Sequence, residues 1–325
     1  MKILKHRFYF FILLISLSLN SCSFKTQEPI TKTGFYLDTF ITISLYDTRD
    51  EEYLNMGMEL CRKYDALLSK TNENSEIYKI NHNHGQPFIV SDETAQLIQK
   101  GIDSAKKTDG LFDISIGRLS SLWDFKDKDS AIPDESTLAE ARTYVDYQQI
   151  KLEGNTVTIP EGMELDLGGI GKGYIGDQLK QFYVEKGITS ALLNLGGNIL
   201  CIGTPPDREQ FLIGIKKPFS NGDPITTVHV DNQCVVTSGV YERYFEKNGK
   251  VYHHILDPAT GYPAETDLYS ATIIADHSVD ADILSTACLM MGKEKAEEFI
   301  KKYNGIRAVL ITNTYEIIFI PSADE

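Results

Sequence analysis

A glycine-rich segment with one lysine contains the residue types that point most directly to chemistry. Residues 166–176 read Asp166-Leu-Gly-Gly-Ile-Gly-Lys172-Gly-Tyr-Ile-Gly176, between a predicted strand over 163–167 and a predicted helix over 174–184. Glycines let main-chain amides approach a ligand, and a helix N-terminus offers unpaired N–H groups with a partial positive charge. With the charge of Lys172, the segment predicts a site for a phosphorylated ligand such as a nucleotide. A glycine-rich turn without a ligand is the alternative.

Two common nucleotide-binding motifs do not fit this segment. The pattern G-x-G-x-x-G occurs, ending at Gly176, but the next predicted strand, residues 190–195, leads into a Leu-Gly-Gly turn. A Rossmann unit requires an acidic residue at about that point. The Walker A pattern fails as well, because Lys172 is followed by Gly173 and not by serine or threonine.

A carboxylate and a hydroxyl side chain lie four residues apart in the sequence near the C-terminus. Asp282 and Thr286 lie on a predicted helix over 279–290, so both oxygens face the same side one turn apart. Such a pair suits Mg²⁺ when main-chain carbonyls and phosphate oxygens complete the shell. The alternative is that Asp282 caps or pairs locally while Thr286 bonds back to the preceding helical turn.

A histidine pair precedes a Pro/Gly turn. His254 could act as a general base or as a phosphate donor, because the ordinary pKa of histidine lies near neutrality, or it could be a surface residue. Asp257 precedes a proline and is a candidate turn-former. Trp123 and Phe125 lie in a third polar and aromatic group that could hold a flavin ring, although core packing is the default for such side chains.

The elements that must position these residues alternate irregularly. The predicted helices cover 53–68, a segment after a Ser91 cap, 279–290 and 293–303, and the predicted strands cover 35–46, 163–167, 190–195, 211–216, 226–230, 251–256, 268–275, 308–312 and 315–320. Residues 124–135 are charged and predict a surface loop. Because strands and helices do not alternate regularly, we expect an α+β fold and not a parallel α/β sheet.

The N-terminus predicts export. Three basic residues precede an apolar stretch over 8–19 that is too short to span a bilayer, and Leu19-Asn-Ser-Cys22 resembles a bacterial lipobox. We therefore expect a lipoprotein-type signal peptide over 1–21, a tether over 22–33, a catalytic domain over 34–325 and a lipid anchor on Cys22. The protein would then face the periplasm or exterior from a membrane of the bacterial envelope. A plain signal peptide or an uncleaved anchor is the alternative.

The net charge of the chain and the spacing of its cysteines limit the ligands and partners that we expect. The formal net charge is −14, and removing residues 1–21 deletes three positive charges and no acid, which gives −17. No basic stripe is present, so the sequence argues against nucleic acid as a partner, and an anionic nucleotide would need a local divalent cation. No cysteine spacing suggests a zinc site. Without residues 1–21 and the proposed anchor Cys22, four cysteines remain, and the sequence does not show whether any two of them form a disulfide: Cys61, Cys201, Cys234 and Cys288.

In the order of its motifs the chain resembles the FAD:protein FMN transferases, the ApbE-like flavin transferases. Eight blocks carry the resemblance: Leu37-Asp-Thr39, Ser75-Glu-Ile-Tyr-Lys-Ile-Asn81, Gly110-Leu-Phe-Asp113 with Gly117, the segment 166–174, Asn194-Leu-Gly-Gly-Asn198, Thr237-Ser-Gly-Val-Tyr-Glu-Arg243, the segment 254–261, and Asp280-Ala-Asp-Ile-Leu-Ser-Thr286. Each block is weak alone, but eight in the same order are specific.

The resemblance implies an ApbE-like fold of mixed and antiparallel sheets with flanking helices, and it implies the site residues. The implied magnesium ligands are Asp282, Thr286 and the carbonyl of Gly169, the implied base is His254, and the implied FAD contacts are Leu37, Leu111, Phe112, Asp113, Asp166, Lys172 and Leu256. The chain departs from the family pattern at Leu37-Asp38, where Met-Gly is frequent, at Thr71, where an aromatic residue is frequent, and at Gly171, where alanine is common.

The reaction implied by the resemblance divides the FAD diphosphate. A serine or threonine hydroxyl of an acceptor protein, typically a redox-complex subunit or another flavoprotein, would attack the FMN-side phosphorus, and AMP would leave with the help of Mg²⁺. Two alternatives stay open. Water could replace the acceptor and give FMN and AMP, or the chain could be a non-catalytic flavin-binding lipoprotein. The acceptor's identity and the oligomeric state do not follow from the sequence.

Overall fold

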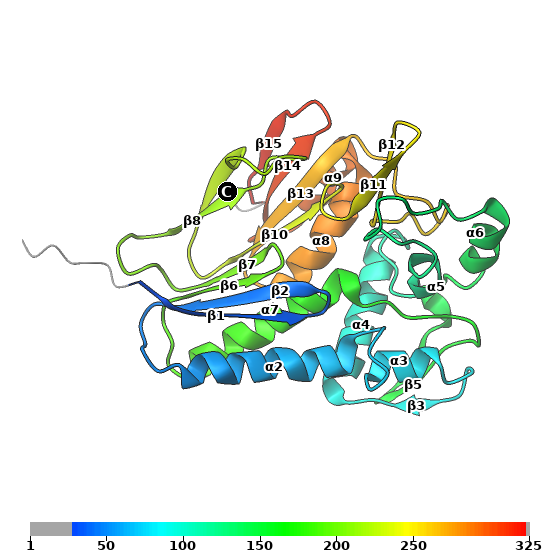
Figure 1. Cartoon of the computed structure of the whole chain (residues 1–325), viewed down its shortest axis with the longest axis horizontal. Helices are drawn as coiled ribbons and strands as arrows, with labels where there is room; N and C mark the ends of the chain where they lie inside the picture. Colours follow the sequence, from blue (N-terminus) through cyan, green and yellow to red (C-terminus); the bar gives the residue numbers. More distant parts are fainter. Residues whose placement is uncertain (1–27, 323–325) are drawn as a thin grey trace, which may run out of the picture.

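The computed structural model describes residues 28–322, which are built around an eight-stranded antiparallel sheet (Figure 1). The strand order is β1-β2-β6-β7-β10-β13-β14-β15. These strands are β1 (Ile30–Tyr36), β2 (Thr39–Leu45), β6 (Ala191–Leu195), β7 (Asn198–Ile202), β10 (Cys234–Gly239), β13 (Leu268–Ala275), β14 (Arg307–Thr312) and β15 (Ile317–Ile320). The fold class expected from the sequence, α+β with antiparallel sheets, is confirmed.

Four helices cover one face of this sheet: α2 (Glu52–Leu68), α7 (Gly168–Glu185), α8 (Ser278–Met291) and α9 (Lys293–Ile300). The amphipathic pattern of α2 buries Leu54, Met58, Cys61 and Tyr64, as its periodicity predicted. Helix α8 is buried around most of its surface, because it lies between α7 on one side and strands β10 and β13 on the other. The largest hydrophobic core therefore lies between the sheet and these helices.

The opposite face of the sheet is partly covered by a hairpin of β8 (Phe211–Ile215) and β9 (Thr226–Val230), which forms a second, smaller core with it. The remaining elements gather beside the helical layer, on the right of Figure 1. They are α3 (Glu76–Asn81), β3 (Phe88–Ile89), α4 (Asp92–Lys107), α5 (Gly117–Ser120), α6 (Glu135–Arg142), a short 3-10 helix (Tyr147–Gln149), β4 (Lys151–Glu153), β5 (Thr156–Thr158), β11 (Tyr244–Lys247) and β12 (Lys250–His253).

Three expectations from the sequence need correction. The predicted strand over 35–46 is a hairpin, because Leu37 and Asp38 both have positive φ and form a two-residue turn between β1 and β2. Residues 163–167 form no strand and make only one isolated bridge, between Glu164 and Ile116. Strand β1 already begins at Ile30, so the expected boundary between tether and domain at residue 34 is four residues late.

The helix after the glycine-rich segment also starts earlier than the sequence predicted. Helix α7 begins at Gly168 and not at residue 174, so the glycines lie inside its first turns. Glycine in a helix costs about 1 kcal/mol relative to alanine, which is why the pattern favoured a turn. Tertiary contact offsets this cost, because a Cβ on Gly173 would lie 2.4 Å from the carbonyl oxygen of Ser278 on α8.

Two further features of the described residues are the state of their cysteines and the character of their helices. Cys61, Cys201, Cys234 and Cys288 are buried and free, and burial raises the pKa of each thiol to about 12, so they remain protonated. None of the helices within residues 28–322 combines the length and the apolar character that crossing a membrane requires. The predicted signal peptide and Cys22 lie outside the described residues.

The contact between α7 and α8 generates a stability prediction. Gly173→Ala should destabilise the fold by about 1–3 kcal/mol, because the new methyl would collide with main-chain atoms of Ser278 and Val279. Thermal or urea unfolding of the purified domain measures this loss. Gly171→Ala is the matched control, since its nearest neighbour would be Leu37 Cδ1 at 3.7 Å, and stability should stay equal or rise by up to about 1 kcal/mol. Equal effects of the two substitutions would contradict the prediction.

Candidate active site

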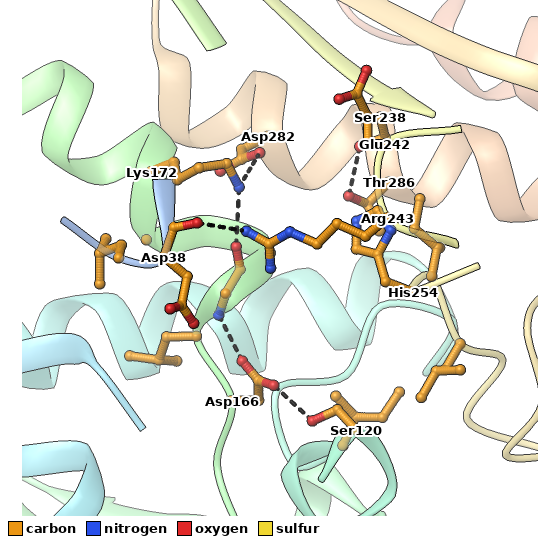
Figure 2. A pocket seen from close by; sticks show the side chains of 18 of the residues that line it. Asp38, Ser120, Asp166, Lys172, Ser238, Glu242, Arg243, His254, Asp282 and Thr286 are labelled. Atoms are coloured by element: carbon orange, nitrogen blue, oxygen red, sulfur yellow. Dashed lines mark hydrogen bonds and ion pairs between the residues drawn. The ribbon is translucent and has the colours of Figure 1, made fainter. Parts of the chain in front are cut away.

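A cavity of about 700 Å³ opens where the amino end of α7, the middle of α8 and the β1–β2 turn meet (Figure 2). Every candidate residue from the sequence that falls within residues 28–322 lines it: Leu37, Leu111, Phe112, Asp113, Asp166, Gly169, Lys172, His254, Leu256, Asp282 and Thr286. The structure therefore brings together residues from five separate segments of the sequence: 37, 111–113, 166–172, 254–256 and 282–286. Only Cys22 cannot be placed, because it lies outside the described residues.

Asp282 connects the two helices at the floor of this cavity. The residue is 3% exposed, and its Oδ2 accepts a hydrogen bond from the main-chain N–H of Gly173 at 2.9 Å. The regular helical acceptor for that N–H would be the carbonyl oxygen of Gly169, four residues earlier. Lys172 Nζ lies 3.9 Å from Asp282 Oδ1 and 3.3 Å from the carbonyl oxygen of Gly168. Asp282 thus pairs across the helices, and not only within its own helix.

Thr286 lies one turn further along α8 and presents a hydroxyl to the same cavity. Its Oγ1 is 2.9 Å from Oγ of Ser238, which lies on β10. The alternative considered from the sequence was a bond from Thr286 back to the helix, but it is Ser285 that makes such a bond, to the carbonyl oxygen of Asp282 at 3.0 Å. Asp282, Thr286 and Ser238 therefore place a carboxylate and two hydroxyls on one wall.

His254 lies on the cavity wall directly after strand β12, and His253 faces the interior. His253 is 6% exposed, with Nε2 3.2 Å from the carbonyl oxygen of Ala264. Burial lowers the pKa of His254 to about 3, and the charges of Arg243, His253 and Lys172 act in the same direction. His254 is therefore neutral at neutral pH, and its Nδ1 has no hydrogen-bond partner among the described residues. The expectation that the pKa of His254 lies near neutrality is therefore wrong.

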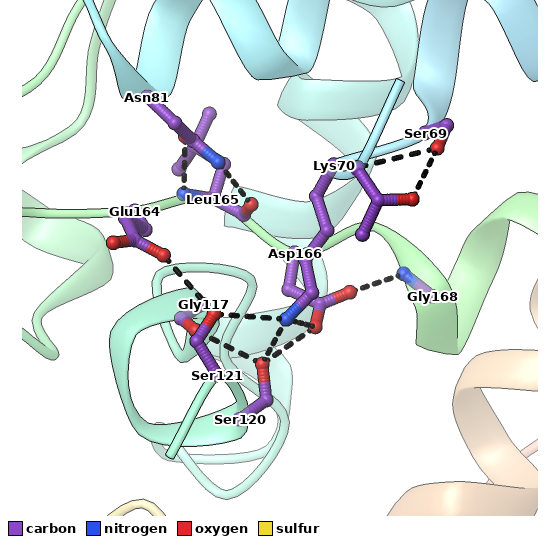
Figure 3. A network of polar contacts seen from close by, with 11 residues as sticks. Ser69, Lys70, Asn81, Gly117, Ser120, Ser121, Glu164, Leu165, Asp166 and Gly168 are labelled. Atoms are coloured by element: carbon purple, nitrogen blue, oxygen red, sulfur yellow. Dashed lines mark hydrogen bonds and ion pairs between the residues drawn. The ribbon is translucent and has the colours of Figure 1, made fainter. Parts of the chain in front are cut away.

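Asp166 is held in a network on the opposite side of the cavity (Figure 3). Its Oδ1 accepts the N–H of Gly168 at 2.8 Å, at the start of α7. Its Oδ2 lies 3.0 Å from Lys70 Nζ and 2.7 Å from Ser120 Oγ. Burial by itself would raise the pKa of this carboxyl group, but Lys70 and the hydrogen bonds from Ser120 and Gly168 outweigh burial and lower it. Asp166 is therefore a carboxylate that fixes the helix start.

The loop at 111–113 contributes shape more than free polar groups. The Asp113 carboxylate accepts hydrogen bonds from Ser115 and from the N–H of Tyr147, so it organises its own loop. Phe112 lies against Gly169, where a Cβ would approach its ring to 2.9 Å. Trp123 and Phe125 line the cavity but stack on each other, with ring centroids 5.6 Å apart. Thr71 also lines the wall, so at this position the cavity has a hydroxyl and no aromatic ring.

Comparison with known proteins identifies the family. A sequence profile of the ApbE family matches residues 37–310, which is most of the chain. The chain belongs to the ApbE family. It is 36% identical over 283 residues to the FAD:protein FMN transferase of Klebsiella pneumoniae, covering 86% of this chain and 87% of the relative. It is 32% identical over 314 residues to that of Treponema pallidum, covering 90% and 87%.

Solved ApbE structures share the fold. The ApbE protein of Thermotoga maritima superposes with a TM-score of 0.82 at 30% identity, covering 90% of this chain and 97% of that one. The apo flavinyl transferase ApbE of Pseudomonas stutzeri gives a TM-score of 0.78 at 26% identity, covering 90% and 94%. The antiparallel sheet with its helical layer is therefore the ApbE fold.

Several cavity residues of this ApbE protein escaped the sequence analysis. Ser238 and Arg243 fall inside the motif blocks but carried no assigned role, and Arg243 donates from Nη2 to the carbonyl oxygen of Asp38 at 3.3 Å (Figure 2). Lys70 and Ser120 had no local signal, because an isolated lysine after a helix and a serine at the end of a four-residue helix are ordinary surface residues. Only the tertiary contact with Asp166 marks them.

The Asp166 network generates a prediction with a defined pH dependence. Lys70→Met should lower the free energy of unfolding by about 1.5–3 kcal/mol at pH 7, because it removes a charged donor from a mostly buried carboxylate. A carboxyl group with a lowered pKa stabilises the fold above its ordinary value near 4, and this contribution is lost as the pH falls through the lowered pKa. The difference from wild type in urea unfolding should therefore shrink below about pH 4.

The control for this prediction is Lys63→Met, which removes a pair with Glu93 whose side chains are 50% and 32% exposed. Such surface pairs contribute about 0–1 kcal/mol. A loss in Lys70→Met that equals the control, or that does not change with pH, would show that Lys70 does not hold Asp166 in its ionised form.

Proposed function

We propose that this protein transfers the FMN part of FAD to a serine or threonine hydroxyl of an acceptor protein and releases AMP, with Mg²⁺ as its cofactor. Transfer of FMN from FAD to protein is the activity that gives the relatives their name. The observation that carries the proposal is the convergence of Lys172, Asp282, Thr286 and His254 on one cavity large enough for a dinucleotide.

The charges around this cavity suit a diphosphate. Lys172 and Arg243 line it, and the N-terminal end of α7, which carries a partial positive charge, lies next to them. The protein carries a net charge of −14, so these local cations must offset a repulsive overall field. The same two cations lower the pKa of His254, which shows that their fields reach the position of the proposed base.

The donor groups present on the α8 wall fit magnesium. Within residues 28–322 no cluster of three or more His, Cys, Asp and Glu side chains could hold a metal. Asp282, the Thr286 hydroxyl and the Gly169 carbonyl would provide hard oxygen ligands, and substrate phosphates and water would complete the shell, which is the usual arrangement for Mg²⁺. When bound there, the ion supplies charge neutralisation at the diphosphate.

The chemical step exchanges one P–O bond for another. The acceptor oxygen forms a bond to the FMN-side phosphorus, the bond from that phosphorus to the bridging oxygen breaks, and AMP leaves with that oxygen. The hydroxyl proton goes to His254, which is neutral and lies on the cavity wall. Positioning by Lys172 and Arg243 then aligns the diphosphate for attack, because in-line geometry is the main requirement of phosphoryl transfer.

One incubation separates transfer from the two alternatives. The protein is mixed with FAD and Mg²⁺, with and without a candidate acceptor, and the products are separated by chromatography and mass spectrometry. Flavin that becomes covalently bound to the acceptor supports the proposal. Free FMN that forms equally without an acceptor supports a hydrolase, and intact FAD that remains bound supports a flavin carrier.

We also propose that the protein is a lipoprotein of the bacterial envelope, anchored through Cys22 and facing the periplasm or exterior. The support is the lipobox-like sequence that ends at Cys22. Cys22→Ser should move the protein from the membrane fraction to a soluble extracytoplasmic fraction. An unmodified N-terminus in the wild-type protein, measured by mass spectrometry, would rule out lipidation at this residue.

Asp282→Ala tests the metal site. The substitution removes the one carboxylate among the proposed ligands, so FMN transfer should fall at least about 100-fold and need more Mg²⁺. Steady-state transfer rates at several Mg²⁺ concentrations measure this effect. Asp280→Ala on the same helix is the matched control, because Asp280 pairs with Lys100 at the surface and does not line the cavity. Unchanged Mg²⁺ dependence in Asp282→Ala would exclude Asp282 as a ligand.

His254→Ala tests the base. Transfer should fall by about 100- to 10,000-fold while FAD affinity changes little, because a positioned base acts on the chemical step. His253→Gln is the control, since it keeps a donor for the Ala264 carbonyl outside the cavity. In the wild-type protein, kcat/KM should stay level as the pH is lowered from about 7 to about 5, because His254 in the free enzyme has a pKa of about 3. A loss centred near the ordinary histidine pKa of about 6.5 would contradict this assignment.

A further inference from the structure

Transfer to a protein restricts how the acceptor can approach the cavity. A serine or threonine hydroxyl lies only two bonds from its Cα atom, so the acceptor main chain must itself reach the mouth. A folded helix or sheet is too wide to do this, whereas an extended segment is narrow enough. The surface that receives such a segment must therefore border the residues that line the mouth.

The β1–β2 hairpin provides a surface of this kind. Its turn residues, Leu37 and Asp38, line the cavity together with Thr39, the first residue of β2. Phe35 and Phe40 flank the turn, with 58% and 67% of their surface exposed, and their rings pack edge to face with centroids 5.2 Å apart. Two large apolar side chains thus lie together in solvent directly beside the mouth, where they stabilise no core.

Strand β1 also has an unpaired edge. It is the terminal strand of the large sheet, and Tyr36 and Thr39 close a two-residue turn in which both central residues have positive φ. In such a hairpin the closing pair exchanges both hydrogen bonds, so the next residue along, and every second residue after it, directs its N–H and C=O outward. Those residues are Phe35, Thr33 and Thr31, and they form no backbone hydrogen bond with another segment of residues 28–322.

We propose that the edge of β1, together with Phe35 and Phe40, is the docking surface for an extended segment of the acceptor protein. The segment adds to β1 as a further strand, which is a known mode of peptide recognition, and its end delivers the hydroxyl past the turn into the cavity. Side-chain contacts with Phe35 and Phe40 favour an apolar residue within about four positions of the hydroxyl residue. This inference rests on the proposed transferase function and identifies how its acceptor is bound.

The charge of the hairpin favours a peptide over a membrane. Residues 30–45 contain one lysine and one aspartate, so the segment is neutral. Surfaces that bind anionic lipid combine aromatic residues with several lysines or arginines, which this hairpin lacks. Continuity with the cavity also favours the acceptor, because a lipid surface on Phe35 and Phe40 would cover the mouth that the acceptor must enter.

The test uses two short synthetic peptides that are unfolded in solution and share a single threonine. They differ only beside the threonine, with valine and isoleucine in one and glutamine in the other. FMN transfer to each is measured by mass spectrometry for the wild-type protein, for the double variant Phe35→Ser/Phe40→Ser, for Thr33→Pro and for Phe319→Ser. Phe319 is the matched control, because it is 59% exposed and lies on β15 at the opposite edge of the same sheet.

The wild-type protein should prefer the apolar peptide at least about tenfold in kcat/KM, and the double variant should lose that preference. Thr33→Pro removes an outward N–H and leaves the backbone hydrogen bonds between β1 and β2 in place, although it also removes the side-chain bond between Thr33 Oγ1 and Thr42 Oγ1, and it should reduce transfer to both peptides. Phe319→Ser should behave as wild type, and FAD affinity should be unchanged in all variants, because none of the altered side chains lines the cavity.

Equal use of the two peptides by the wild-type protein, or an unchanged preference in the double variant, would overturn the docking proposal. So would transfer to an intact acceptor protein with none to either peptide. Loss of binding to anionic vesicles in the double variant, with peptide transfer retained, would assign the surface to the membrane, and a change from dimer to monomer would assign it to a second copy of the chain. If no hydroxyl of any acceptor receives FMN while FAD is bound, the transferase function itself is wrong.

Discussion

Helices α7 and α8 touch through glycine, and this contact decides where the charged groups of the cavity lie. Gly173 and Gly176 let α7 approach the main chain and side chain of Ser278 at the start of α8. Asp177 strengthens the contact, because its carboxylate accepts the N–H groups of Ser278 and Val279 at 2.7 and 2.9 Å. With the helices held this close, the Asp282 carboxylate reaches a main-chain N–H of α7, which a wider spacing would prevent.

The cavity concentrates opposite charges inside an acidic protein. Lys172 and Arg243 lie toward the α8 wall, and Lys70 lies on the other side, where Asp166 and Ser120 hold it. A diphosphate entering this space meets cations that are already positioned, so little reorganisation is needed on binding. Burial is the main reason that His254 is neutral, and the cations that attract phosphate act in the same direction, because they repel a proton from the imidazole.

The mouth of the cavity joins segments that lie far apart in the sequence. The β1–β2 turn meets the 124–126 loop through an ion pair between Asp38 and Lys126 at 3.2 Å, and it meets the segment after β10 through Arg243. Both central residues of this turn have positive φ, although neither is glycine, so about 1 kcal/mol or more of strain is held at the mouth. Strain of this kind persists only where the surrounding contacts determine the conformation.

Periodicity along the sequence predicted the α+β class and the longer helices, because it is a local signal, and the resemblance carried by the ordered motif blocks pointed to many of the residues that line the cavity. The sequence misplaced the start of α7, since local propensity counts each glycine as a cost and cannot register the contact with Ser278 that offsets it. It also overestimated the pKa of His254, and it left Lys70 and Ser120 unmarked. Those features depend on burial and on charges from distant segments, and only the tertiary structure brings these within a few ångströms of each other.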